Sequence, residues 1–284
     1  MERRTFIAGG LLTTGSSLAP YWFSEAINEG FNPQEISSLH GHLTVTLLAQ
    51  ETMIPYQGGS RWAMTYNGIF PGPTLRVNPG DTLAIKLINK LSEPTNLHTH
   101  GLHTSPNGNG DNPFLMINPG ESFSYVIKIP QTQMSGTFWY HPHHHELSAA
   151  QVSSGLAGAI IVEDGIDQLG LITKSTEKVL VLADPRIGNN RSVSYGSRMD
   201  SMMGRTGPHT LVNGLLLPTI HNSSSLLRLR VVNSCVTQYQ NLRIPGVEIF
   251  QISSDSSRLT KPVLVESIQL TPGQRSEFFV SAKS

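Results

Sequence analysis

The feature of this sequence that most constrains its fold is an internal repeat. Residues 66–89 and 212–233 both run from an Asn-Gly turn through a proline into an alternating strand that ends in asparagine. Two further pairs of segments match in the same order, 95–101 with 240–246 and 117–127 with 270–280. Because a repeated pattern of this kind encodes a repeated structural unit, we expect two copies of one fold.

The repeated unit is predicted to be made of strands. After about residue 40, short β-branched or aromatic runs, most of them alternating with polar residues, are bounded by Gly, Pro, Asn or Asp. These runs cover residues 42–50, 82–90, 122–129, 158–164, 178–184, 226–233 and 276–282. Only 146–158 allows a short helix. The 26 Gly, 18 Pro and 14% charged residues fit a β-rich chain with many turns, so we predict an all-β, sandwich-like fold.

The repeat also predicts the domain organisation. We expect a first domain at 40–165 and a second at 176–284, with the boundary near 165–176. The first copy continues from Gly120 to His141 and then adds a further strand, whereas the second copy ends soon after Gly273. We therefore expect the second domain to lack its closing strands and to be incomplete.

The N-terminus indicates export. Arg3 and Arg4 precede an uncharged run rich in small residues that reaches Leu18, so residues 1–30 resemble a twin-arginine signal and predict a periplasmic protein. The run is too short to remain as a membrane anchor. Lys plus Arg and Asp plus Glu number 20 each, so nothing in the charge suggests nucleic acid or an anionic membrane as a partner.

Two histidine pairs are the strongest chemical signal. His98 and His100 are two residues apart, as are His141 and His143, and side chains spaced in this way share one face of a strand. One such pair could be structural, but two pairs in the same repeat indicate a metal site. Neutral imidazoles without a carboxylate or thiolate favour copper or zinc. The second repeat has Arg243 and Pro245 where the first has His98 and His100, so we expect no equivalent site there.

Three segments, "NLHTHGLHTSPNGNGDNPF", "GTFWYHPHHH" and "QVSSGLAGAIIVEDG", together resemble the multicopper oxidases, which include laccases and bacterial copper-efflux oxidases. The likeness runs from about residue 42 to the end and covers that family's first two domains. It implies tandem cupredoxin-like Greek-key β-sandwiches. It also implies that His98 binds a type 2 copper and that His100, His141 and His143 bind a type 3 pair. Such a cluster reduces dioxygen to water with four electrons drawn from a reducing substrate.

The resemblance implies two further features. Family members place an acid near the cluster to deliver protons, and Asp111 is the candidate, although an Asp in a Gly/Asn-rich turn is also ordinary turn chemistry. The type 1 copper of the family binds a His-Cys-His motif in a third domain, and this sequence contains no such motif. Its single cysteine, Cys235, is expected to be a buried small residue.

Three functions remain open on the sequence alone. The chain is the N-terminal part of a multicopper oxidase, with the third domain lost or supplied by another chain; or it binds or sequesters copper without turnover; or it is a structural cupredoxin pair. The intact histidine pairs argue against the third. We expect this chain by itself to show no oxidase turnover.

Overall fold

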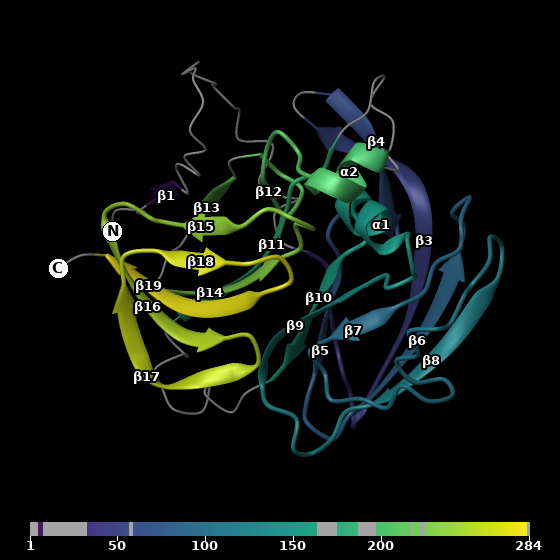
Figure 1. Ribbon diagram of the computed structural model, residues 1–284. Coiled ribbons are helices and arrows are strands. Elements are labelled where there is room, and N and C mark those ends of the chain that lie inside the picture. The colour runs from purple at the N-terminus through teal and green to yellow at the C-terminus, as the bar shows by residue number, and fades with distance from the viewer. Residues whose placement is uncertain are drawn as a thin grey trace.

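The computed structural model describes residues 5–7, 33–56, 59–163, 175–186, 197–216, 218–221 and 225–282 (Figure 1). Strands make up most of these residues and form several sheets, which confirms the predicted all-β fold. The predicted signal lies outside the described residues except for β1 (Thr5–Ile7), which pairs with β13 (Thr219–His221). Most of the expected boundary at 165–176 also lies outside them, so the domain limits stay a prediction.

The first sandwich consists of two sheets with a common core. The four-stranded sheet runs in the order β4 (Gly59–Tyr66), β3 (His42–Tyr56), β6 (Thr82–Asn89), β8 (Ser122–Lys128). The five-stranded sheet runs β2 (Glu35–Ser37), β5 (Gly72–Val77), β10 (Gly158–Val162), β9 (Gly136–His141), β7 (His98–His100). In β3, burial alternates so that Leu43, Val45 and Leu47 face the core, as the period of a strand requires.

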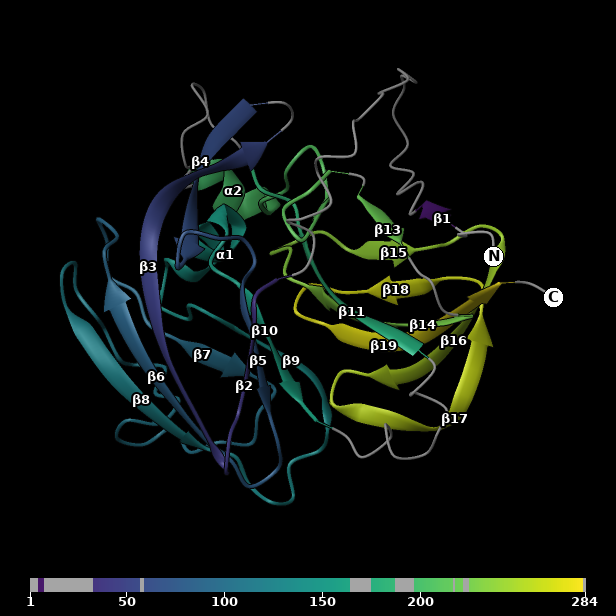
Figure 2. The same ribbon diagram turned by 180° about the vertical axis from the view of Figure 1, so that it is seen from behind.

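The second unit is built on a six-stranded sheet. Its order is β12 (Leu211–Val212), β11 (Ser175–Ala183), β14 (Leu226–Asn233), β19 (Arg275–Ala282), β16 (Val247–Ser254), β17 (Ser257–Val265). A short pair, β15 (Gln240–Leu242) with β18 (Ile268–Leu270), contributes to its core, which includes Leu229, Leu270 and Phe278. Figure 2 shows the two units side by side.

The sheet order and turns of the first unit recur in the second. β4-β3-β6-β8 and β12-β11-β14-β19 have the same order, with a parallel central pair in each, β3 with β6 and β11 with β14. Both Asn-Gly turns are left-handed, with φ of 58° at Asn67 and 49° at Asn213. Each asparagine side chain also accepts a backbone N–H and donates to a carbonyl of the neighbouring strand.

The asparagines that end β6 and β14 also have matching roles. Asn89 donates to the carbonyls of Glu93 and Ile117, and Asn233 donates to those of Gln238 and Leu270. These contacts tie each strand end to the segment that follows it. The sequence repeat is therefore a structural repeat down to single hydrogen bonds.

The two units pack through a second apolar core and a charged cluster. Trp139, Ala159 and Ile161 of the five-stranded sheet pack against Val179, Val181 and Val232 of the six-stranded sheet. Because both faces of β9 and β10 are covered, these strands are buried along their whole length. This packing fixes the strand that ends in His141.

The charged cluster lies in the same interface. The Glu277 carboxylate accepts from Arg228 and Arg230 at 2.6 Å each and from Thr137 Oγ1 of β9 at 2.7 Å. Glu177 accepts from Arg230 at 2.7 Å and from Arg76 of β5 at 2.6 Å. The cluster therefore joins the two units through the Arg76–Glu177 ion pair and the hydrogen bond from Thr137 to Glu277.

Two short helices complete the described part of the chain. α1 (Ser148–Ser154) lies inside the segment predicted to allow a helix, and α2 (Arg198–Met203) begins with a capping box between Ser197 and Asp200. Neither has the length and apolar character needed to cross a bilayer.

Candidate metal centre

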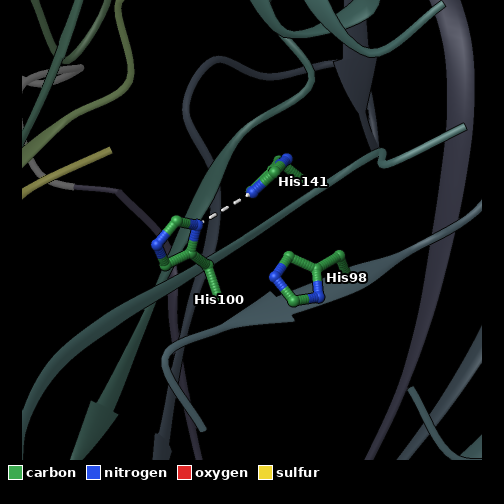
Figure 3. Close-up of side chains that lie close together, drawn as sticks. All are labelled: His98, His100 and His141. Carbon is green, nitrogen blue, oxygen red and sulfur yellow. Dashed lines mark hydrogen bonds between the residues drawn. The ribbon is translucent and has the colours of Figure 1, made fainter. Parts of the chain in front are cut away.

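Two neighbouring strands bring three histidines together. β7 and β9 pair antiparallel with His98 opposite His141 and His100 opposite Trp139. Because side chains alternate along a strand, His98, His100 and His141 lie on one side of this pair (Figure 3). Thr99 and Tyr140, the residues of opposite parity, are fully buried. The structure therefore places His98 and His100 on one face of the same strand, as their spacing predicts.

The nitrogen atoms of these three rings converge. One possible ligand atom from each of His98, His100 and His141 lies within 4.8 Å of the others. His100 Nδ1 is 3.3 Å from His141 Nε2, the contact drawn in Figure 3. The ring centroids are 5.3 to 5.6 Å apart. The three side chains thus bring ring nitrogens from two strands to one place.

His143 reaches this group by a different route from the one predicted. β9 ends at His141, and Pro142 has no N–H with which to continue a ladder, so His143 lies outside the strand. Its backbone N–H donates to Asn96 Oδ1 at 2.7 Å. The His143 ring centroid is 5.2 Å from that of His98 and 6.1 Å from that of His141. His143 therefore borders the group of three but is held by a loop.

Asp111 holds His98. The Asp111 carboxylate lies 3.0 and 3.1 Å from His98 Nδ1 and accepts from the backbone N–H and hydroxyl of Thr99 at 2.8 and 2.7 Å. Burial alone would raise the pKa of Asp111, but the hydrogen bonds from His98 and Thr99 outweigh it and keep that pKa below its ordinary value. Asp111 is therefore held as a carboxylate. Because it engages Nδ1 of His98, Nε2 of that ring is left directed at the other rings.

His141 and His100 are kept neutral. Burial, together with the neighbouring His98, lowers the pKa of His141 well below its ordinary value. Burial and the nearby Arg275 lower the pKa of His100 to about 4. His141 Nδ1 lies 2.8 Å from the carbonyl of Pro142, which directs Nε2 to the group, and the ring stacks on Trp139 at 3.9 Å. Neutral imidazole is the form that binds metal ions.

The contacts of several residues near the histidines could not be predicted from the sequence. Asn96 also donates to the carbonyl of Leu115 at 3.1 Å, so it connects the Asp111 loop to His143, and a single asparagine carries no signal of this. The His144 ring nitrogen Nδ1 faces the backbone carbonyl of His145. In the second repeat, β15 ends at Leu242, before Arg243 and Pro245.

Comparison with known protein families identifies both halves of the chain. Residues 48–166 and 194–284 each match a family profile described as multicopper oxidase. The multicopper oxidase mco of Staphylococcus epidermidis is 31% identical over 262 residues, covering 90% of this chain and 58% of that protein. The cell division protein FtsP of Proteus mirabilis is 33% identical over 218 residues, covering 75% of this chain and 45% of that protein.

Solved structures agree on the fold. A multicopper oxidase from Campylobacter jejuni, described as a metallo-oxidase, aligns with a TM-score of 0.74 and 29% identity, over 90% of this chain and 56% of its own. A laccase from Pediococcus acidilactici aligns with a TM-score of 0.77 and 27% identity, over 88% of this chain and 55% of its own. The predicted cupredoxin-like β-sandwiches are thereby confirmed.

The chain spans a little over half the length of the relatives with the strongest matches, 58% of the Staphylococcus epidermidis protein. The two profile matches together cover most of the chain and belong to one family. With these relatives and structures, they show that the chain belongs to the multicopper oxidase family.

Proposed function

We propose that this chain is the N-terminal part of a copper-dependent oxidase and that His98, His100, His141 and His143 supply its copper ligands. The observation that carries the proposal is the convergence of His98, His100 and His141 within 4.8 Å. The family implies copper cofactors, and the donor set fits: imidazole nitrogens suit copper, and two of the rings are held neutral by burial.

We assign His98 to a type 2 site and His100, His141 and His143 to a type 3 pair. Copper bound there would supply the redox chemistry that passes electrons from a reducing substrate to dioxygen. The protein's own part is to orient the ligands. Asp111 and the Pro142 carbonyl each engage one ring nitrogen, so that the other nitrogen of His98 and of His141 is available.

Asp111 has the contacts of an orienting residue. Both of its oxygens are engaged, by His98 Nδ1 and by Thr99. We also propose that Asp111 relays protons. Its carboxylate lies 3.0 Å from Nδ1 of the half-buried His98 ring, so a proton could pass between the two groups. We propose that a third domain, which these residues do not include, holds the type 1 copper and the binding site of the reducing substrate.

The experiment that tests the ligand assignment is copper titration of the purified chain. We expect copper binding to be lost in a His98→Gln/His141→Gln double variant and retained in His42→Gln, which changes an exposed histidine of β3. Copper content equal in all three proteins would refute the assignment.

Copper binding without turnover is the second candidate, because the sequence has no His-Cys-His motif for a type 1 site. We expect no intense blue colour and no oxygen consumption by this chain alone with a phenolic or cuprous substrate. Steady oxygen uptake by the pure chain would instead show that it turns over without the third domain.

A third candidate, a role in cell division, is supported by the likeness to FtsP. Copper titration distinguishes it as well, since a purely structural sandwich pair would not need the converging histidines.

We also propose export by the twin-arginine route, on Arg3 and Arg4. An Arg3→Lys/Arg4→Lys variant should remain in the cytoplasm, whereas the original sequence should reach the periplasm. Equal distribution of the two would contradict this route.

A further inference from the structure

The turn at 271–274, which leads into β19 of the second unit, lies against the metal centre of the first. A Cβ atom placed on Gly273 would be 3.3 Å from His100 Cε1, 3.9 Å from His100 Nε2 and 3.8 Å from Trp139 Cζ2. The backbone of this turn therefore covers the edge of the His100 ring that carries Nε2. The other nitrogen, Nδ1, faces His141.

The turn is held firmly from its own side. The Gly273 N–H donates to the Asn233 carbonyl at 2.8 Å, and the Asn233 N–H donates to the Gln274 carbonyl at 3.0 Å. The Gln274 side chain in turn accepts the Thr271 N–H at 2.9 Å. Because Asn233 is itself tied to Leu270, the turn cannot withdraw from His100 without breaking contacts in the second unit.

Arg275 ties the same turn to the strands of the first unit. Its Nε donates to the Thr137 carbonyl of β9 at 3.1 Å, and its Nη1 donates to the Gly273 carbonyl at 3.3 Å. Its Nη2 lies so close to Gly101, the residue after His100, that a Cβ there would be 2.6 Å away. The backbone on the far side of His100 is thus fixed by the side chain that also fixes Gly273.

We propose that the turn at 271–274 is a positioning element of the metal centre and that Gly273 sets the ring of His100 so that Nδ1 is presented to the metal. This inference rests on the proposed metal-binding function. It gives the second unit, which has no histidine pair, a direct part in shaping the site.

The first unit contains a matched control. Gly120 occupies the equivalent turn, with φ of 83° against 80° at Gly273. The Gly120 N–H donates to Asn89 at 2.8 Å, as the Gly273 N–H does to Asn233. A Cβ on Gly120 would meet nothing within 4 Å. Substitution at either glycine strains the backbone equally, but only Gly273 lies against a histidine.

The test compares Gly273→Ala with Gly120→Ala in two measurements. In the copper-free protein, the ring ¹⁵N and ¹H resonances of His100, assigned with His100→Gln, should shift in Gly273→Ala and stay unchanged in Gly120→Ala. In a titration with copper alone, Gly273→Ala should lose about tenfold or more in affinity, the usual effect of disturbing a residue that orients a ligand, and Gly120→Ala should bind like the original.

A second pair of variants covers loss of folding. Asparagine tolerates positive φ better than alanine and still carries a Cβ, so Gly273→Asn and Gly120→Asn repeat the comparison with less backbone strain. Equal His100 resonances and equal copper affinity in the two members of a pair would overturn the inference, as would equal losses in both. Failure of the original protein to bind copper would refute the proposed function, whereas the resonances would still decide the role of Gly273.

Discussion

Replacing Glu277 by glutamine should weaken the whole molecule, because this carboxylate is the centre of the buried charged cluster. Glu277 is only 2% exposed, and its two arginine partners, Arg228 and Arg230, are 0% and 1% exposed. A glutamine side chain offers only one acceptor oxygen, and its amide group would face the donors of Arg228, Arg230 or Thr137. The two guanidinium groups would then share one carboxylate fewer in an environment that water does not reach.

The expected cost is large. Removing one partner of a buried ion pair costs about 3–5 kcal/mol. In this variant Arg228 and Arg230 would keep only the carboxylate of Glu177, which Arg76 also uses. For a domain of this size the midpoint of thermal unfolding moves by roughly 2–4 °C per kcal/mol, so a fall of roughly 6–20 °C follows. Since Thr137 of β9 also donates to Glu277, the loss should extend to the strand that ends in His141.

Thermal and urea unfolding followed by circular dichroism are the assays. Glu266→Gln is the matched control, since it removes the same charge from an exposed position beside β17, and it should change the free energy of unfolding by less than about 0.5 kcal/mol. Thr137→Val should cost about 1 kcal/mol, because it removes one hydrogen bond and no charge. If Glu277→Gln unfolds within about 1 kcal/mol of the original protein, the reasoning that ion pairing stabilises this interface is wrong.

Three further predictions concern single groups. Asp111→Asn should lower copper affinity by about 10- to 100-fold in a metal titration, because His98 loses its carboxylate partner, and unchanged affinity would contradict the orienting role. The Cys235 thiol is 3% exposed and burial raises its pKa, so iodoacetamide at pH 8 should label it only after unfolding, as mass spectrometry of native and urea-treated samples can show. Burial alone would raise the pKa of Glu177, but Arg230, Arg228 and Arg76 outweigh it and lower that pKa. The stability that Glu177 provides is therefore present above its unfolded pKa of 4.5 and is lost as the pH falls below it. Urea unfolding from pH 7 to pH 3 should show this loss, and Glu177→Gln should flatten it.

Most of the strand pattern could be predicted because alternation and turn residues are local signals. The runs predicted at 226–233 and 158–164 became β14 (Leu226–Asn233) and β10 (Gly158–Val162). The hairpin of β16 and β17 was not predicted, since β17 is exposed along nearly its whole length and lacks a buried face. β3 also runs beyond the predicted 42–50 to Tyr56, where it pairs with β4 alone.

The metal site could be predicted only in part. The spacing of His98 and His100 in one strand was enough to place them on a common side. His143 could not be placed in this way, because its position depends on Pro142 and on a hydrogen bond to Asn96, 47 residues away. The contact of Gly273 with His100 was also beyond reach, since packing between two units leaves no periodic trace in the sequence.

The matching asparagines of the two repeats bear on how such a chain can evolve. Asn67 with Asn213 and Asn89 with Asn233 tether the same strands in both copies through side-chain bonds to main-chain atoms, which do not depend on neighbouring side chains. After a gene duplication, substitutions at other positions would leave these tethers intact. One copy could therefore lose its metal-binding side chains and acquire Arg243 and Pro245 while keeping its architecture. Within each repeat, the asparagines that tether the strands occupy other positions than the histidine pairs of the first repeat, so the histidines can change while the tethers stay.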